Sequence, residues 1–227
     1  MKSKYLRTVL SILGIAGIVA FLLIPNKKIY ECLEKDLSFH QYGDSASGIA
    51  FAELSPAGFK CELLKENGNC GVGFSFGQSK MDFRNWSLMD SLVLELQGSE
   101  NLKEVIVQIL AFAPEHTDIN ERHTMKPLLK ELKLTPEKKR YSIHMQHFYT
   151  PDYWFEQQKV KNRHNPKRFY AIMGLEIFTG WQNKTETPLE LKIESICTKG
   201  HSNLLFVILI CYLATLIIIA ISVRTKN

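Results

Sequence analysis

Two segments of the chain are hydrophobic without interruption. The first runs from Thr8 to Pro25 and the second from Leu204 to Val223, and neither contains Asp, Glu, Lys, Arg or His. A helix that is apolar on every side lacks the polar face of a helix on a soluble protein. Because about 20 helical residues cross the roughly 30 Å hydrocarbon core of a bilayer, residues 8–25 and 204–223 are predicted to be transmembrane helices.

The sequences that flank these segments are basic. Lys and Arg occur three times in residues 1–7 and twice in residues 224–227. Positive flanks stay on the cytoplasmic side, so both termini are predicted to be cytoplasmic and the central region periplasmic or extracellular. A basic start before an apolar run also occurs in cleaved signal peptides. The length of the first run and the absence of a small-x-small cleavage site before Lys27 favour an uncleaved anchor.

The net charge of +5 comes from these flanks alone. The chain has 28 Lys and Arg against 23 Asp and Glu, and the flanks carry five of the basic residues and none of the acidic ones. The central region is therefore neutral. A neutral region lacks the general attraction to a phosphate backbone that nucleic-acid-binding proteins use, so nucleic acid is not expected as a partner. The lipid bilayer, in contrast, is an expected partner of the two apolar segments.

Between the apolar segments, short alternating or apolar runs are separated by turn residues. Alternation is clearest in residues 92–96 and 189–196 and predicts strands with one face in water. Nine candidate strands occur, at 49–54, 58–64, 71–76, 91–97, 105–112, 128–134, 141–146, 170–178 and 189–196. The prediction is an antiparallel β-sandwich at 47–197, with a linker and first strand at 26–46 and a second linker at 198–203.

Several phrases in this region resemble a known family. They are a Gly-rich strand from Gly71 to Gly77, the segment Met81–Leu96 with its Asp-Phe pair, and the aromatic-Pro-aromatic phrase His147–Trp154. Their order resembles that of galactose-binding-like jelly-roll domains, which include many carbohydrate-binding modules and the extracytoplasmic sensor regions of bacterial membrane signalling proteins. The resemblance extends over Ser47–Ile196. It implies a jelly-roll fold and a saccharide or similar small ligand.

The same resemblance bears on cofactors and partners. No cofactor is expected other than a structural calcium ion, which such domains often hold on a loop, and no Asp-x-Asp pattern marks its place. Sensors of this kind carry a kinase, cyclase or DNA-binding domain after the last span, whereas this sequence continues for four residues after the second apolar segment. A separate membrane or cytoplasmic protein is therefore expected to act on whatever the outer domain binds.

Aromatic side chains are the first candidates for ligand contacts. Trp154, Tyr153, Trp86 and Trp181 have rings that stack on sugars, and pockets combine such walls with a few polar groups. The alternative is that these rings fill the ends of the sandwich.

A basic run at 159–168 supplies two further candidates, Lys161 and Arg163. These side chains would bind an acidic sugar, a phosphate group or an acidic patch of another protein. The alternative is an ordinary solvated loop.

Four cysteines, Cys32, Cys61, Cys70 and Cys197, lie in the central region, and an even number in an oxidising compartment predicts disulfides. Cys61 and Cys70 flank a turn sequence and would face each other across a hairpin. Cys32 and Cys197 each lie seven positions from an apolar segment, so both are held near one membrane surface. Four buried thiols are the alternative. None of them has zinc-site spacing, so no metal site is predicted at the cysteines.

No nucleophile elbow, His-Glu-x-x-His helix, Walker loop or dinucleotide fingerprint occurs, so an enzyme is not expected. A hydrolase would need carboxylates that meet in a cleft, from among Asp82, Asp90, Glu95 and Glu176. The first hypothesis is a membrane-anchored ligand-binding sensor module that acts through a separate partner. The alternative is a structural or assembly subunit of a membrane complex that binds protein. A concave aromatic-lined pocket would favour the first, and a flat apolar patch the second.

Overall fold

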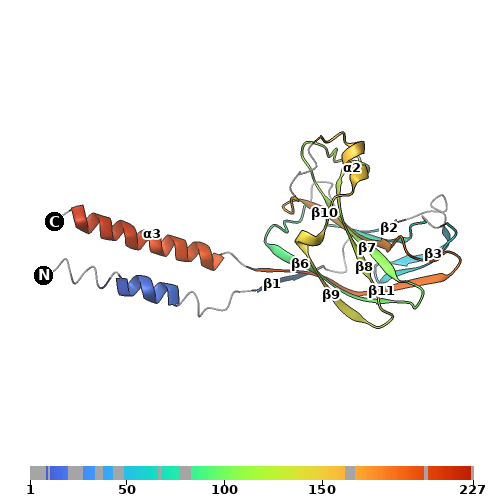
Figure 1. Cartoon of the computed structure of the whole chain (residues 1–227), viewed down its shortest axis with the longest axis horizontal. Helices are drawn as coiled ribbons and strands as arrows, with labels where there is room; N and C mark the ends of the chain where they lie inside the picture. Colours follow the sequence, from blue (N-terminus) through green and yellow to red (C-terminus); the bar gives the residue numbers. More distant parts are fainter. Residues whose placement is uncertain are drawn as a thin grey trace. The chain divides into compact units, whose positions relative to one another are not determined.

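A computed structural model describes residues 9, 11–19, 28–33, 38–42, 49–65, 68–76, 83–161, 167–201 and 204–225. The chain divides into two compact units, one formed by Met1–Ile29 with Gly200–Asn227 and the other by Tyr30–Lys199. Figure 1 shows the helices and strands of both. The second unit contains the region predicted to be a β-sandwich.

The first unit contains helical segments that contact each other. Residues 11–19 are helical, and α3 runs from Leu204 to Thr225. The hydroxyl of Tyr212 in α3 donates a hydrogen bond to the carbonyl oxygen of Leu13, at 2.9 Å. Within the described residues, no helix has the length and apolar character needed to cross a membrane. The two predicted spans and their orientation stay predictions.

The second unit is built from two β-sheets. The described strands are β1 (Lys28–Cys32), β2 (Ser38–Tyr42), β3 (Ile49–Ser55), β4 (Gly58–Leu63), β5 (Gly71–Ser75), β6 (Met89–Gly98), β7 (Glu104–Ala111), β8 (Lys126–Lys133), β9 (Lys139–His144), β10 (Ile172–Thr179) and β11 (Pro188–His201). The six-stranded sheet has the order β3-β4-β11-β6-β9, with β1 also paired to β11, and the five-stranded sheet has the order β2-β5-β10-β7-β8. The predicted antiparallel β-sandwich is confirmed.

The two ends of this domain differ from the prediction. Residues 26–46 were expected to hold one strand, and they contain β1 and β2, which belong to different sheets. Strand β11 continues to His201, through part of the segment expected to be a linker. It pairs with β4 over Pro188–Lys192 and also with β1. This long strand therefore has three partners in its sheet, β4, β6 and β1.

Alternate side chains of the strands fill the space between the sheets. In β7, Val105, Val107 and Ile109 are fully buried in the main apolar cluster, and Leu175 and Ile177 of β10 join them. Burial of each such side chain contributes about 1.5–3 kcal/mol. Because successive strand residues point to opposite sides, the residues between these five face outward from the five-stranded sheet.

The cysteines follow the predicted pairing in one case. Cys32 and Cys197 form a disulfide that joins β1 to β11. Cys61 and Cys70 are instead buried free thiols. Their connection is not a hairpin, because β4 and β5 belong to different sheets, so the two residues are not cross-strand partners. A hydrogen bond to Cys61, together with burial, raises the pKa of the Cys70 thiol above its usual value.

Candidate functional site

The outward face of the five-stranded sheet carries a row of opposed residues, three of which are polar. Glu176 of β10 lies opposite Gln108 of β7, and Gln108 lies opposite Leu129 of β8. Leu129 in turn pairs with Tyr149, which extends the sheet by one residue. Opposed residues of an antiparallel pair point to the same face of a sheet. This row therefore lies on the side away from the apolar core.

Glu176 lies at one end of this row. Only 1% of it is exposed. Gln108 donates a hydrogen bond from Nε2 to Oε2 of the carboxylate, at 2.6 Å, and Arg122 donates one from Nη2 to Oε1. A carboxylate so deeply buried is stable only when it is paired and hydrogen-bonded, which these two residues provide. The carboxylate thereby fixes the guanidinium of Arg122, whose side chain is 46% exposed.

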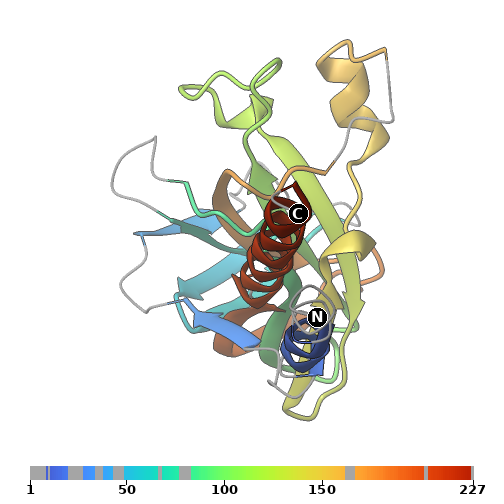
Figure 2. The same ribbon diagram turned by 90° about the vertical axis from the view of Figure 1, so that its left-hand side faces the viewer.

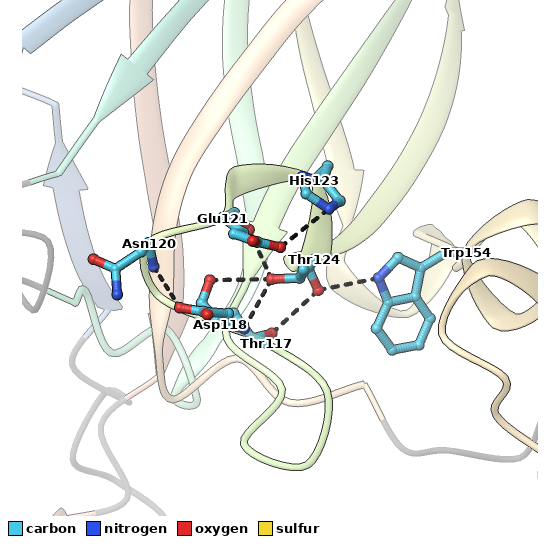
Figure 3. A network of polar contacts seen from close by, with 7 residues as sticks. All are labelled: Thr117, Asp118, Asn120, Glu121, His123, Thr124 and Trp154. Atoms are coloured by element: carbon cyan, nitrogen blue, oxygen red, sulfur yellow. Dashed lines mark hydrogen bonds and ion pairs between the residues drawn. The ribbon is translucent and has the colours of Figure 1, made fainter.

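The loop between β7 and β8 holds Arg122 in place. Figure 3 shows the polar network of this loop. The amide of Asp118 donates to the hydroxyl of Thr124 at 2.8 Å, and that hydroxyl lies 2.7 Å from the carbonyl oxygen of Glu121. The indole of Trp154 donates to the carbonyl oxygen of Thr124 at 3.3 Å. These contacts enclose the short 3₁₀ turn Arg122–Thr124 on both sides.

Helix α2, Asp152–Gln157, supports the same end of the domain. Figures 1 and 2 both show α2 and the β7–β8 loop at one end of the sandwich. Trp154 points into a small apolar cluster with Ala113 and Phe155, and its indole contacts the loop as described above. The helix therefore presents Tyr153, the residue before Trp154, to solvent, with 48% of Tyr153 exposed.

Two tyrosines stand beside the polar row. Tyr149 is 40% exposed, and its hydroxyl donates a hydrogen bond to Oε1 of Glu131. Burial and this hydrogen bond raise the pKa of Tyr149 to about 12. Burial and the negative charge of Glu176 also raise the pKa of Tyr153. Both phenols are therefore neutral at ordinary pH, and about half of each residue is open to a ligand.

A third exposed aromatic residue lies in the loop after β10 and contacts the first residue of β7. Trp181 is 52% exposed, and its backbone amide donates to Oε1 of Glu104 at 3.2 Å. Gly180 allows this approach, because a Cβ there would lie 2.5 Å from the same oxygen. Asn183 closes the loop by donating to the carbonyl oxygen of Glu104 at 2.7 Å. The loop after β10 is thus fixed and presents the Trp181 ring.

The predicted site residues separate into two groups. Tyr153 and Trp181 are exposed, as a ligand contact requires. Trp154 and Trp86 are buried, and Trp86 packs in the core with its ring 5.2 Å from that of Phe76. The alternative, that aromatic rings fill the ends of the sandwich, holds for these two. Lys161 is exposed, and Arg163 lies outside the described residues.

Three residues of this face were not among the predicted contacts. Tyr149 belongs to the aromatic phrase 147–154, and Glu176 interrupts an apolar strand, so both had a sequence signal. Arg122 had none, because its partner Glu176 is 54 positions away. Of the carboxylates considered for a hydrolase, Asp90 and Glu95 belong to β6 and Glu176 to β10 in the other sheet, so these described residues form no pair across the two strands. Asp82 lies outside the described residues. Among the described side chains, no group of His, Cys, Asp and Glu is arranged to hold a metal ion.

Comparison with known proteins places the fold. No family model matches the sequence, and no curated protein matches it. Among solved structures, a family 11 carbohydrate-binding module from Clostridium thermocellum, in complex with a β-1,3-1,4-mixed-linked tetrasaccharide, is similar, with a TM-score of 0.52 and 11% identity over 76% of this chain and 96% of that one. A family 30 carbohydrate-binding module of a cellulosomal cellulase of the same organism has a TM-score of 0.51 and 8% identity over 77% and 99%. The jelly-roll β-sandwich of carbohydrate-binding modules is therefore the fold of this domain, as the sequence resemblance implied.

Proposed function

We propose that the domain Tyr30–Lys199 is a carbohydrate-binding module that holds a glycan on the outward face of its five-stranded sheet. The observation that carries this proposal is the placement of two half-exposed rings, Tyr149 and Tyr153, beside the fixed pair of Arg122 and Glu176. The fold likeness to two carbohydrate-binding modules supports it.

The chemistry of this face suits a sugar chain. The C–H face of a pyranose stacks on an aromatic ring, and tyrosine offers such a ring with little side-chain entropy to lose. The guanidinium of Arg122 donates to ring and hydroxyl oxygens, and the carboxylate of Glu131 accepts from sugar hydroxyls. Because Glu176 and the loop network hold Arg122, and Tyr149 is hydrogen-bonded to Glu131, a glycan would bind a preorganised surface. Trp181 would extend that surface toward a further sugar.

The same geometry supports binding without cleavage. The carboxylate of Glu176 accepts hydrogen bonds from Gln108 and Arg122, which fits a positioning role and not proton transfer. A hydrolase would use a pair of carboxylates on either side of the scissile bond.

We propose further that the two apolar segments anchor the module in a bilayer, outside the cytoplasm, and that it acts as a sensor through a separate partner protein. The uninterrupted apolar sequences and their basic flanks support the anchor. The disulfide between Cys32 and Cys197 supports an oxidising compartment.

A glycan-binding screen of the full chain in lipid nanodiscs tests the proposal. The protein should bind soluble β-glucans. Tyr149→Ala and Tyr153→Ala should each weaken this binding by about tenfold, because each variant loses one stacking contact. Tyr170→Ala is the matched control, because Tyr170 is 42% exposed but lies before β10 and outside the polar row. No binding to any glycan, or equal losses in all three variants, would refute the proposed site.

A further inference from the structure

Helix α2 presents Tyr153 to solvent, but it is too short to be stable by itself. It has six residues, and no side chain caps its first turn with a hydrogen bond. Isolated helices shorter than about 12 residues are marginal in water. The position of α2 therefore depends on its two buried side chains, Trp154 and Phe155, and on the residues that they contact.

The Trp154 ring is held from several directions. The His116 ring stands at a right angle to it, with 5.7 Å between the centroids, and the Phe155 ring lies 5.5 Å away. The indole N–H donates to the carbonyl oxygen of Thr124, as Figure 3 shows. On the face of the ring, the Nζ atom of Lys126 lies 5.6 Å from the centroid. Lys126 thus adds a charged contact to the residue that anchors α2.

Lys126 is buried at a cost. It is the first residue of β8, and 3% of it is exposed. Burial, together with the positive charge of Arg168, lowers the pKa of its amine, and the carboxylate of Glu115 opposes this shift. A charged amine in such a place requires compensating interactions. The electron-rich face of the Trp154 ring supplies one, because a desolvated cation–π contact is stronger than an exposed one.

We propose that Lys126 is a positioning residue of the glycan site, which acts through Trp154 on Tyr153. Its ammonium attracts the face of the Trp154 ring and holds α2 in the orientation that leaves the adjacent Tyr153 exposed. Without this charge, Trp154 keeps its apolar contacts but α2 is held less firmly, so a glycan meets a less ordered Tyr153 ring. The inference rests on the proposed function of the domain.

Hydrogen exchange tests the contact in the absence of any glycan, on the full chain in nanodiscs. Lys126→Met keeps the length of the side chain and removes its charge. The amide of Gln158, which donates to the carbonyl oxygen of Trp154 at 2.9 Å, should exchange about fivefold faster in this variant. Lys126→Arg should restore the slow exchange, because it keeps the positive charge. Unchanged exchange in Lys126→Met would overturn the proposal.

Glycan affinity tests the link to Tyr153. Lys126→Met should weaken the binding of a soluble β-glucan about fivefold, and Lys126→Arg should restore it. In the Tyr153→Ala background, Lys126→Met should cause no further loss, because both changes remove the same contact with the ligand. A further fivefold loss would show that Lys126 acts by another route and would overturn the proposal. If the wild type binds no glycan, the proposed function fails and this role of Lys126 fails with it, whereas faster exchange would still support the contact with Trp154.

Lys139→Met is the matched control. The Nζ atom of Lys139 also lies 5.6 Å from the centroid of an aromatic ring, that of Tyr141. Both residues belong to β9 in the six-stranded sheet. This variant should leave the exchange of Gln158 and the glycan affinity unchanged. Equal effects of Lys126→Met and Lys139→Met would show a general consequence of the lost charge and would contradict the proposal.

Discussion

The hydroxyl of Tyr212 and the carbonyl oxygen of Leu13, 2.9 Å apart, join helical segments from opposite ends of the chain. Gly17 makes this contact possible, because a Cβ at that position would lie 2.4 Å from Cε1 of the Tyr212 ring. A small residue at a helix contact lets the two backbones approach closely, which is a common basis of helix association in lipid.

Replacement of Gly17 should break this contact. Gly17→Ala forces the Tyr212 ring to move and removes its hydrogen bond, at a cost of about 1 kcal/mol. Gly14→Ala is the control on the same helix, because a Cβ there would lie 4.0 Å from Leu216, an ordinary contact. Thermal unfolding of the full chain in detergent measures both. Tyr212→Phe combined with Gly17→Ala should cost no more than either change alone, and an additive result would contradict this account.

Arg122→Ala should destabilise the domain by about 2 kcal/mol, because the buried carboxylate of Glu176 loses a charged partner. Arg84→Ala is the control. Arg84 pairs with Glu31 at 2.5 Å, but both side chains are about one third exposed, and such pairs contribute about 0–1 kcal/mol. Urea unfolding gives both values. If Glu176→Gln fails to restore stability to Arg122→Ala, the buried charge is not the cause.

Because of Tyr149, the free energy of unfolding depends on pH in the alkaline range. The pKa of Tyr149 is raised from 10.0 to about 12 in the folded protein. Between these values the unfolded chain ionises and the folded chain does not, so the free energy of unfolding falls as pH rises from 10 to 12. Tyr149→Phe should show a shallower fall than the wild type. Parallel curves for wild type and Tyr149→Phe would show that this hydroxyl titrates normally.

Mass mapping without reductant should find Cys32 linked to Cys197. Reduction should lower stability by about 2–4 kcal/mol, because the bond closes a loop with a sequence separation of 165. Cys61 and Cys70 should resist alkylation in the folded protein and react after denaturation, since both are buried. A linked Cys61–Cys70 peptide would instead support the second disulfide that the sequence predicted.

The sequence by itself determined the features that depend on neighbouring residues. Alternation in residues 92–96 and 189–196 predicted β6 and β11, because strand side chains alternate with a period of two. The equal distance of Cys32 and Cys197 from the apolar segments predicted their disulfide. The Gly-rich and aromatic phrases predicted the jelly roll.

Only the tertiary structure decided which residues form the candidate site. Tyr153 and Trp154 are adjacent and chemically similar, yet the packing of α2 on the β7–β8 loop exposes the first and buries the second. The pairing of Arg122 with Glu176 depends on the order β10-β7-β8. Cys61 in β4 and Cys70 just before β5 are not hairpin partners, because β4 and β5 belong to different sheets. Local patterns specify which side chains of one strand face the core. The contacts between strands depend on sheet order and register, which are set by packing over the whole domain.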